Sequence, residues 1–205
     1  MALHTLFPTR VYTAPLRAQG VTAFNDKLIN EINHLREDDR AGQIWSKAHY
    51  PGGYTSYASA SRMQSCSPTF AALEAKLTQH IRAYAKALAF DLKARPLTMT
   101  DCWVNVMPPG VAHSLHLHPL STFSGTYYVK TPARASGLKL EDPRLDRFMA
   151  APPRAMDQRS DQAPWVVMPA KAGHLILFES WLRHEVTANT ARTERVSISF
   201  NYSWF

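Results

Sequence analysis

Residues 195–204 read RVSISFNYSW and alternate without a break between polar and apolar side chains. Side chains two apart along a β-strand point to the same face of a sheet, so this alternation predicts a strand. The apolar face is expected to pack in the core and consists of Val196, Ile198, Phe200, Tyr202 and Trp204. The other face carries one arginine, one asparagine and three serines rather than the lysine and glutamate usual at a wet surface. This composition suits the wall of a polar cavity, and the alternative is an ordinary strand with one wet face.

Five more segments with strand-like patterns precede this one. They are Leu97–Met107, Thr122–Lys130, Leu138–Glu141, Trp165–Met168 and His174–Phe178. Turn residues such as Pro108-Pro109-Gly110 separate several of them. Short strands at this spacing are typical of an antiparallel sandwich or barrel, so we expect a mainly β fold with flanking helices.

Two amphipathic helices are expected before residue 97. Apolar residues recur at steps of three and four from Phe24 to Leu35 and again from Phe70 to Leu88. Ser67 suits the N-cap of the second helix. No linker divides the sequence, so we expect a single domain over residues 1–205, in which a helical region (1–96) supports a β core (97–205).

The composition excludes several classes of protein. Hydrophobic residues make up 45% of the 205 residues and charged residues 19%, which is ordinary for a globular chain. The net charge is +7, but no run of five or more Lys and Arg occurs, which disfavours nucleic-acid binding. Two cysteines do not make a disulfide framework, and no signal-peptide or membrane-span pattern is present. We therefore expect a cytoplasmic protein; the oligomeric state is left open.

Three of the nine histidines crowd into residues 113–118. His116 and His118 are two apart, so in a strand both side chains can reach one metal ion. His113 has the opposite parity and is expected to point away. His184, ahead of the last strand, is the best third ligand, and imidazole suits iron, copper, zinc and nickel alike. The remaining histidines have no partner pattern and are expected to be structural: His4, His34, His49, His80 and His174.

Arg195 and Ser197 lie two apart on the polar face of the last strand. A guanidinium offers two parallel donors and a hydroxyl a third, which together can bind a carboxylate. A short turn between His184 and this strand would bring Arg195 within the length of a small dicarboxylate from the metal.

At these residues the chain resembles the 2-oxoglutarate- and iron(II)-dependent oxygenases, and more closely a bacterial set of uncharacterised members. The resemblance covers most of the chain, including Leu6–Thr9. Its main motifs are Trp103–Val106, His116–Pro119, Ser124–Val129, Glu141–Arg144, Phe178–His184 and Glu194–Asn201.

The resemblance implies a double-stranded β-helix, or jelly roll, and a dioxygenase that uses Fe(II) and 2-oxoglutarate. His116, His118 and His184 would bind the metal, and Arg195 with Ser197 would bind the distal carboxylate of 2-oxoglutarate. His118 stands where the superfamily usually has aspartate, so this site has one negative charge fewer. The resemblance does not identify the substrate.

Other residues on neighbouring strands are candidates for the cofactor pocket. Tyr127 and Asn105 are expected to line it, with Trp103 and Tyr128 nearby, although the tyrosines could equally belong to the core. Residues 143–164 form a long loop that contains Arg144, Arg147 and Arg154. The loop is either a lid over a small-molecule or peptide substrate, for which the arginines suit an acidic group, or a plain surface loop.

Two other functions stay open from the sequence. Gly110 ahead of His116 and His118, with Pro169 and Gly173 ahead of His184, also looks like a cupin, whose three-histidine site would work without 2-oxoglutarate. The glutamate that a cupin carries after the histidine pair is missing, since Thr122 and Phe123 stand there. A non-catalytic module with a structural metal is the third possibility, but structural zinc sites have four protein ligands and only three are well placed here.

Overall fold

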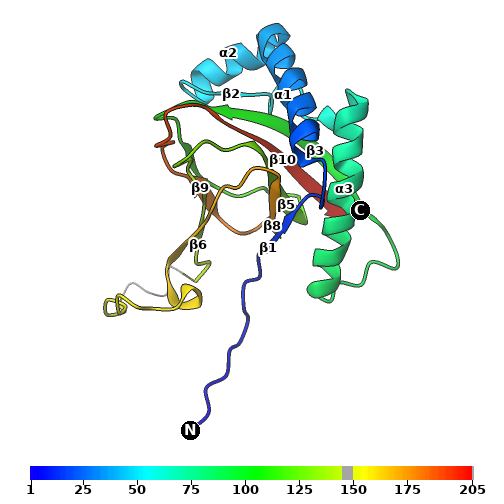
Figure 1. The fold of residues 1–205 in the computed structure, drawn as a ribbon. Coiled ribbons are helices and arrows are strands. Elements are labelled where there is room, and N and C mark those ends of the chain that lie inside the picture. The colour runs from blue at the N-terminus through cyan, green and yellow to red at the C-terminus, as the bar shows by residue number, and fades with distance from the viewer. Residues whose placement is uncertain (145–149, 205) are drawn as a thin grey trace.

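The computed structural model describes residues 1–144 and 150–204. Its helical elements in the described part are Val21–Asp38 (α1), Arg40–His49 (α2), Met63–Ser65 (η1), Pro68–Ala87 (α3) and Ser160–Gln162 (η3) (Figure 1). Its strands are Tyr12–Pro15 (β1), Tyr54–Thr55 (β2), Leu97–Met107 (β3), His113–His116 (β4), Phe123–Lys130 (β5), Leu138–Glu141 (β6), Trp165–Met168 (β7), His174–Glu179 (β8), His184–Val186 (β9) and Arg195–Trp204 (β10).

The strands form two antiparallel sheets. The larger sheet has the order β1-β8-β5-β10-β3-β2, and the smaller has the order β4-β9-β6-β7. The smaller sheet faces one side of the larger sheet, and the long helices lie on the other side (Figure 1). The mainly β fold with flanking helices is therefore confirmed, and its architecture is the double-stranded β-helix, or jelly roll.

The predicted helices α1 and α3 pack against the outer face of the larger sheet. Leu28 and Ile32 of α1 are fully buried there, beside the apolar face of β10. At the start of α3, Ser67 Oγ accepts a hydrogen bond from the Phe70 backbone N–H at 3.2 Å, as the cap prediction required. This helix-side core holds β10 in place, so that its polar face is turned toward the smaller sheet.

A second core fills the space between the two sheets. Its buried members come from both sheets and from the connections between them, and they are Tyr50, Met107, Val111, Tyr128, Leu138, Leu140, Ile176, Phe178, Leu182 and Val186. The larger sheet is thus covered on both faces. The inner cavity that the histidines line borders this core, since Leu138, Phe178 and Val186 belong to both.

Several elements were not predicted from the sequence. The region before residue 97 contains α2 as well as β1 and β2, which form the two edges of the larger sheet. That region is therefore not only a helical support. Trp204 was expected on the core face of β10, but it is 45% exposed and its indole N–H donates to the Arg95 carbonyl at 3.0 Å. No described helix is both long and apolar enough to cross a membrane.

Candidate metal centre

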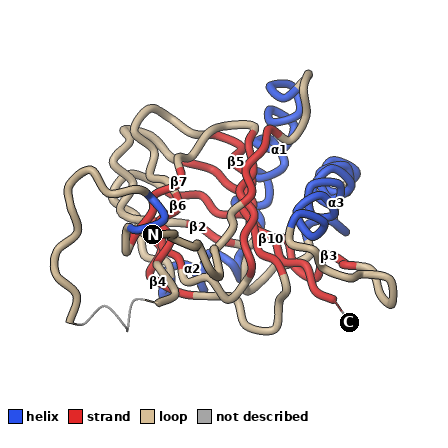
Figure 2. Tube along the Cα trace, turned by 90° about the horizontal axis from the view of Figure 1, so that it is seen from below, coloured by secondary structure: helices blue, strands red, loops and turns tan. Residues whose placement is uncertain are grey.

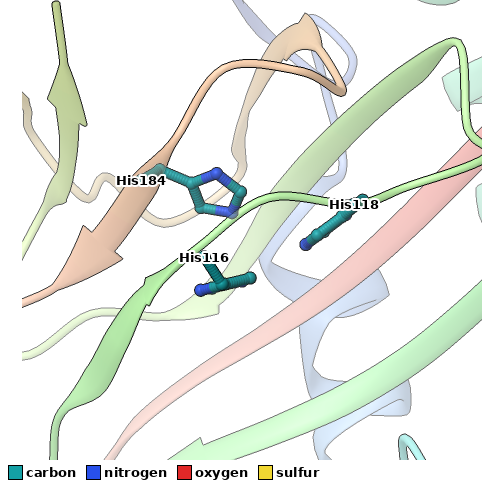
Figure 3. Close-up of side chains that lie close together, drawn as sticks. All are labelled: His116, His118 and His184. Carbon is teal, nitrogen blue, oxygen red and sulfur yellow. The ribbon is translucent and has the colours of Figure 1, made fainter. Parts of the chain in front are cut away.

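The pairing of two short strands brings two of the histidines together. His116, at the end of β4, lies directly opposite His184, at the start of β9. His118 follows β4, where its backbone N–H donates to the Ser180 carbonyl at 3.1 Å. The three rings converge on one space between these segments, and their ligand nitrogens all lie within 4.8 Å of one another (Figure 3).

Backbone carbonyls fix the tautomers of two of the rings. His116 Nδ1 lies 2.7 Å from the Ser114 carbonyl oxygen, and His184 Nδ1 lies 2.9 Å from the Leu182 carbonyl oxygen. A carbonyl oxygen can only accept a hydrogen bond, so each Nδ1 carries the proton. Each Nε2 is then left with a free lone pair for a metal ion, as in most protein sites with histidine ligands.

Two successive hydrogen bonds between side chains fix the tautomer of His118. Its Nδ1 lies 2.7 Å from Asn201 Oδ1, and Asn201 Nδ2 donates to Asp101 Oδ2 at 3.3 Å. The carboxylate can only accept, which sets the orientation of the Asn201 amide, and the amide oxygen in turn requires a proton on His118 Nδ1. Ser124 Oγ also lies 2.8 Å from this nitrogen. Asp101 was not recognised as part of the site from the sequence.

Burial keeps the rings of His118 and His184 neutral. It lowers the pKa of His184 to about 3, assisted by the nearby His116, and lowers the pKa of His118 to about 4. A neutral imidazole is the form that binds metal, so neither of these two rings has to lose a proton at pH 7. Three imidazole nitrogen donors with no fourth protein ligand in the described cluster fit an open site for a first-row transition metal such as iron(II).

His113 faces the same space, contrary to the parity argument. The register of β4 against β9 is irregular between His113 and His116, so the simple alternation of faces does not hold there. The His113 ring lies 5.8 Å from the His116 ring and 4.4 Å from the Tyr50 ring, measured between centroids. It is nevertheless not one of the three residues that the described structure groups as metal ligands.

Arg195 is a buried cation beside this cluster. It is 2% exposed, its Nη1 donates to Ser197 Oγ at 3.4 Å, and its guanidinium carbon lies 4.9 Å above the Tyr128 ring. No carboxylate forms an ion pair with it in the described part of the chain, and its Nε has no hydrogen-bond partner there. The Tyr128 hydroxyl, although near the guanidinium, also lacks a hydrogen bond of good geometry among these residues. A buried cation with unused donors is the arrangement expected of a carboxylate site.

An inner cavity of about 50 Å3 connects this arginine to the histidines. Its lining includes Asn105, Arg195 and Ser197 as well as the three clustered histidines. Asn105 Nδ2 donates to Ser199 Oγ at 3.0 Å, while its Oδ1 has no partner among the described residues. The predicted polar face of β10 is thus a cavity wall, and Asn105 lies where the sequence placed it.

Tyr127 does not line the pocket, so its assignment was wrong. It pairs opposite Ile198, lies in the helix-side core, and donates from its hydroxyl to Asn25 Oδ1 at 2.5 Å. A step of one residue along a strand reverses the face, so it is Tyr128 that lies beside Arg195.

The described part of the 143–164 loop stays away from the histidines. Residues 150–164 lie on the opposite side of the molecule from α3 (Figures 1 and 2), and none of them lines the inner cavity or the larger cavity beside it. Arg144 forms an ion pair with Asp142, with its Nε 3.1 Å from Oδ1. Arg147 lies outside the described residues.

Comparison with known proteins gives one family and many structures of the same fold. Residues 101–201, which include the three histidines, Arg195 and Ser197, match the family described as "Putative 2OG-Fe(II) oxygenase". No curated protein matches the chain.

Two of the solved structures illustrate the similarity of fold. A prolyl-4-hydroxylase from Pseudomonas putida is 15% identical, with a TM-score of 0.61 over 95% of this chain and 92% of its own. HygX from Streptomyces hygroscopicus, solved with nickel and 2-oxoglutarate bound, is 12% identical, with a TM-score of 0.65 over 96% of this chain and 83% of its own.

Proposed function

Because the chain belongs to the 2-oxoglutarate- and iron(II)-dependent oxygenases, we propose that it is a dioxygenase whose iron is bound by His116, His118 and His184. Members of this superfamily are oxidoreductases that use iron(II) and 2-oxoglutarate. The observation that carries the residue assignment is the pairing of an open three-histidine cluster with a buried, unpaired arginine in one cavity.

Iron(II) held by the three histidines would supply the oxidising chemistry. Oxygen would be the oxidant, and 2-oxoglutarate and the substrate would be the two sources of electrons. The chain supplies binding and orientation. Peptide carbonyls hold the rings of His116 and His184, and the Asn201 amide holds the ring of His118. The three lone pairs are therefore oriented before any metal binds, which lowers the entropic cost of binding.

Arg195 and Ser197 would bind the distal carboxylate of 2-oxoglutarate. Both residues line the inner cavity of about 50 Å3, which also reaches the three histidines. The remainder of the cofactor would extend toward the histidines. Asn105 and Tyr128 would be supporting residues, since each holds a buried polar atom without a good partner in the described structure.

Asp101 offsets the charge that is lost when histidine stands in the place of aspartate. It is two hydrogen bonds away from the His118 ring, through Asn201. A carboxylate at this distance raises the basicity of a ligating imidazole without itself binding the metal. This arrangement supports iron binding at a site with three neutral ligands.

The proposal extends to the substrate class, the domain division and the compartment. A substrate that is a small molecule or a peptide suits the larger cavity beside the histidines. The shared core of helices and larger sheet supports one domain over 1–205. The free thiols of Cys66 and Cys102 support a reducing compartment such as the cytoplasm.

Conversion of 2-oxoglutarate to succinate tests the function. The iron-loaded chain is incubated with oxygen and 2-oxoglutarate, and succinate is followed by NMR. We expect succinate from the unaltered chain and from His174→Ala, a control outside the cluster, but none from His184→Ala. Equal succinate from His184→Ala, or neither turnover nor binding of 2-oxoglutarate by the unaltered chain, would rule out the proposal.

A further inference from the structure

A second, larger cavity opens beside the metal ligands. Its volume is about 570 Å3, which is within the usual range for sites that bind small molecules. It shares Trp103, His113, His116 and His118 with the inner cavity. If the proposed function holds, this is where the substrate binds, and the chemistry of its wall indicates the substrate class.

Three large aromatic side chains form an aromatic wall in this outer cavity: Trp45, Tyr57 and Trp103. Tyr57 lies between two tryptophans, with its ring centroid 6.0 Å from Trp45 and 5.2 Å from Trp103 in an edge-on contact. The Trp103 ring in turn lies 5.6 Å from the His118 ring. Trp45 is on α2, Tyr57 follows β2 and Trp103 is on β3, so three separate elements supply these rings.

Two of the three rings are open to solvent, while Trp103 is 6% exposed and lines both cavities. Tyr57 is 51% exposed, and Trp45 is partly exposed. Large aromatic side chains gathered around an opening are uncommon at a surface that binds nothing, because their burial would be favourable. The wall is therefore suited to a ligand that gains from contact with the faces or edges of aromatic rings.

Among the described residues that line this cavity, Asp101 alone has a carboxylate, and none is a lysine or arginine. This is notable in a chain with a net charge of +7. Asp101 is two residues before Trp103 on β3 and so lies on the same face of the strand. Thr100 Oγ1 and Asn201 Nδ2 both donate to its Oδ2, at 2.7 Å and 3.3 Å.

We propose that the outer cavity binds an organic cation, an ammonium or guanidinium group of the substrate, between the aromatic wall and Asp101. The faces of tryptophan and tyrosine attract such cations, and a nearby carboxylate adds a counter-charge. This proposal rests on the proposed function for its link to catalysis. It therefore favours a positively charged substrate, in contrast to the acidic substrate that the arginines of the 143–164 loop suggested.

A matched pair of probes isolates the charge. Choline and 3,3-dimethylbutan-1-ol have nearly the same shape, and only choline is positively charged. Each is titrated into the protein loaded with iron(II) and 2-oxoglutarate without oxygen, and binding is followed by the fluorescence of the cavity tryptophans and by ligand NMR. We expect choline to bind at least about tenfold more tightly, since a partly desolvated cation–aromatic contact is worth ~1–2 kcal/mol.

Two variants test the residues. Tyr57→Leu removes the central ring and is expected to reduce the preference for choline about tenfold or more, and Asp101→Asn should reduce it by a similar factor. Asp26→Asn, at an exposed acid on α1, is the matched control and should leave choline binding unchanged. Iron content and 2-oxoglutarate binding are measured on every sample, because Asp101 also contacts Asn201.

Equal binding of the two probes, or no binding of choline at about 0.1 M, would overturn the proposal, as would full choline binding in Tyr57→Leu. Each of these three results can occur while 2-oxoglutarate still binds, in which case the oxygenase assignment stands. Loss of 2-oxoglutarate binding by the unaltered chain would instead count against the proposed function.

Discussion

Replacing Arg195 with methionine should change two properties in opposite directions. The side chain is 2% exposed and has no carboxylate partner among the described residues, so the folded chain without cofactor holds a desolvated charge. Its contacts there are a long hydrogen bond to Ser197 Oγ at 3.4 Å, a contact to Met107 Sδ at 3.9 Å and the face of Tyr128. Methionine keeps most of the apolar length and removes the charge.

The magnitudes follow from this environment. Replacing buried charged groups by apolar ones of similar size is often neutral or stabilising by ~1–4 kcal/mol. We therefore expect the free energy of unfolding without cofactor to rise, with a gain in Tm of about 2–4 °C per kcal/mol for a chain of this size. Binding of 2-oxoglutarate loses a charged hydrogen-bond partner worth ~1.5–3 kcal/mol, or about 10- to 150-fold in affinity.

Thermal unfolding followed by circular dichroism measures both effects. The protein is loaded with iron(II) without oxygen and heated with and without 2-oxoglutarate. We expect the cofactor to raise the Tm of the unaltered chain by more than that of Arg195→Met, whose Tm without cofactor is already higher. Arg36→Met is the matched control, since Arg36 forms a partly exposed ion pair with Glu194 at 3.0 Å and lines neither cavity.

Two results would refute the reasoning about Arg195. If Arg195→Met binds 2-oxoglutarate as tightly as the unaltered chain, the guanidinium is not the carboxylate site. If the variant without cofactor is less stable by several kcal/mol, the arginine stabilises the fold, and its unused donors do not indicate a ligand.

Four further substitutions test other parts of the site and of the core. His118→Asp should retain iron(II), since aspartate is the usual ligand at this position, and elemental analysis showing a metal-free but folded variant would contradict the placement. Tyr128→Phe should weaken 2-oxoglutarate by ~1 kcal/mol in calorimetry, whereas Tyr127→Phe should leave its affinity unchanged and lower stability by ~1–3 kcal/mol; the reverse pattern would restore the original assignment. Gly125→Ala places a Cβ 2.6 Å from ring atoms of Phe200, so denaturant unfolding should show a loss of ~1–3 kcal/mol, and an unchanged stability would mean that the core there is looser than described.

Most of the regular elements could be predicted from their residue patterns. The strands β3, β6, β7 and β10 begin and end where those patterns indicated, and α1 and α3 follow the predicted apolar stripes. The edge strand β2 is only two residues long, too short to show a period, and β1 (YTAP) lacks the apolar pattern of the equally short β6 (LKLE) and β7 (WVVM). Their existence depends on pairing with strands far away in the sequence.

The site shows the same limit. The three histidines could be found from spacing and order, whereas the direction of His113 depended on an irregular register that the sequence does not reveal. Tyr127 was assigned to the pocket in place of Tyr128 because β5 is buried on both faces. Its residue pattern therefore does not show which face is turned toward the cavity. Asp101 reaches the His118 ring through a hydrogen bond to Asn201 on β10, which no local pattern encodes.

The central claim is that His116, His118 and His184 hold iron to which 2-oxoglutarate binds. Titration of 2-oxoglutarate into the iron(II)-loaded chain without oxygen, followed by the visible charge-transfer absorption of the chelate, tests it most directly. We expect the absorption in the unaltered chain and in His113→Ala, and its loss together with the metal in His184→Ala. A chain that holds iron but gives no absorption and no heat of 2-oxoglutarate binding, or a His184→Ala variant that gives both in full, would contradict it.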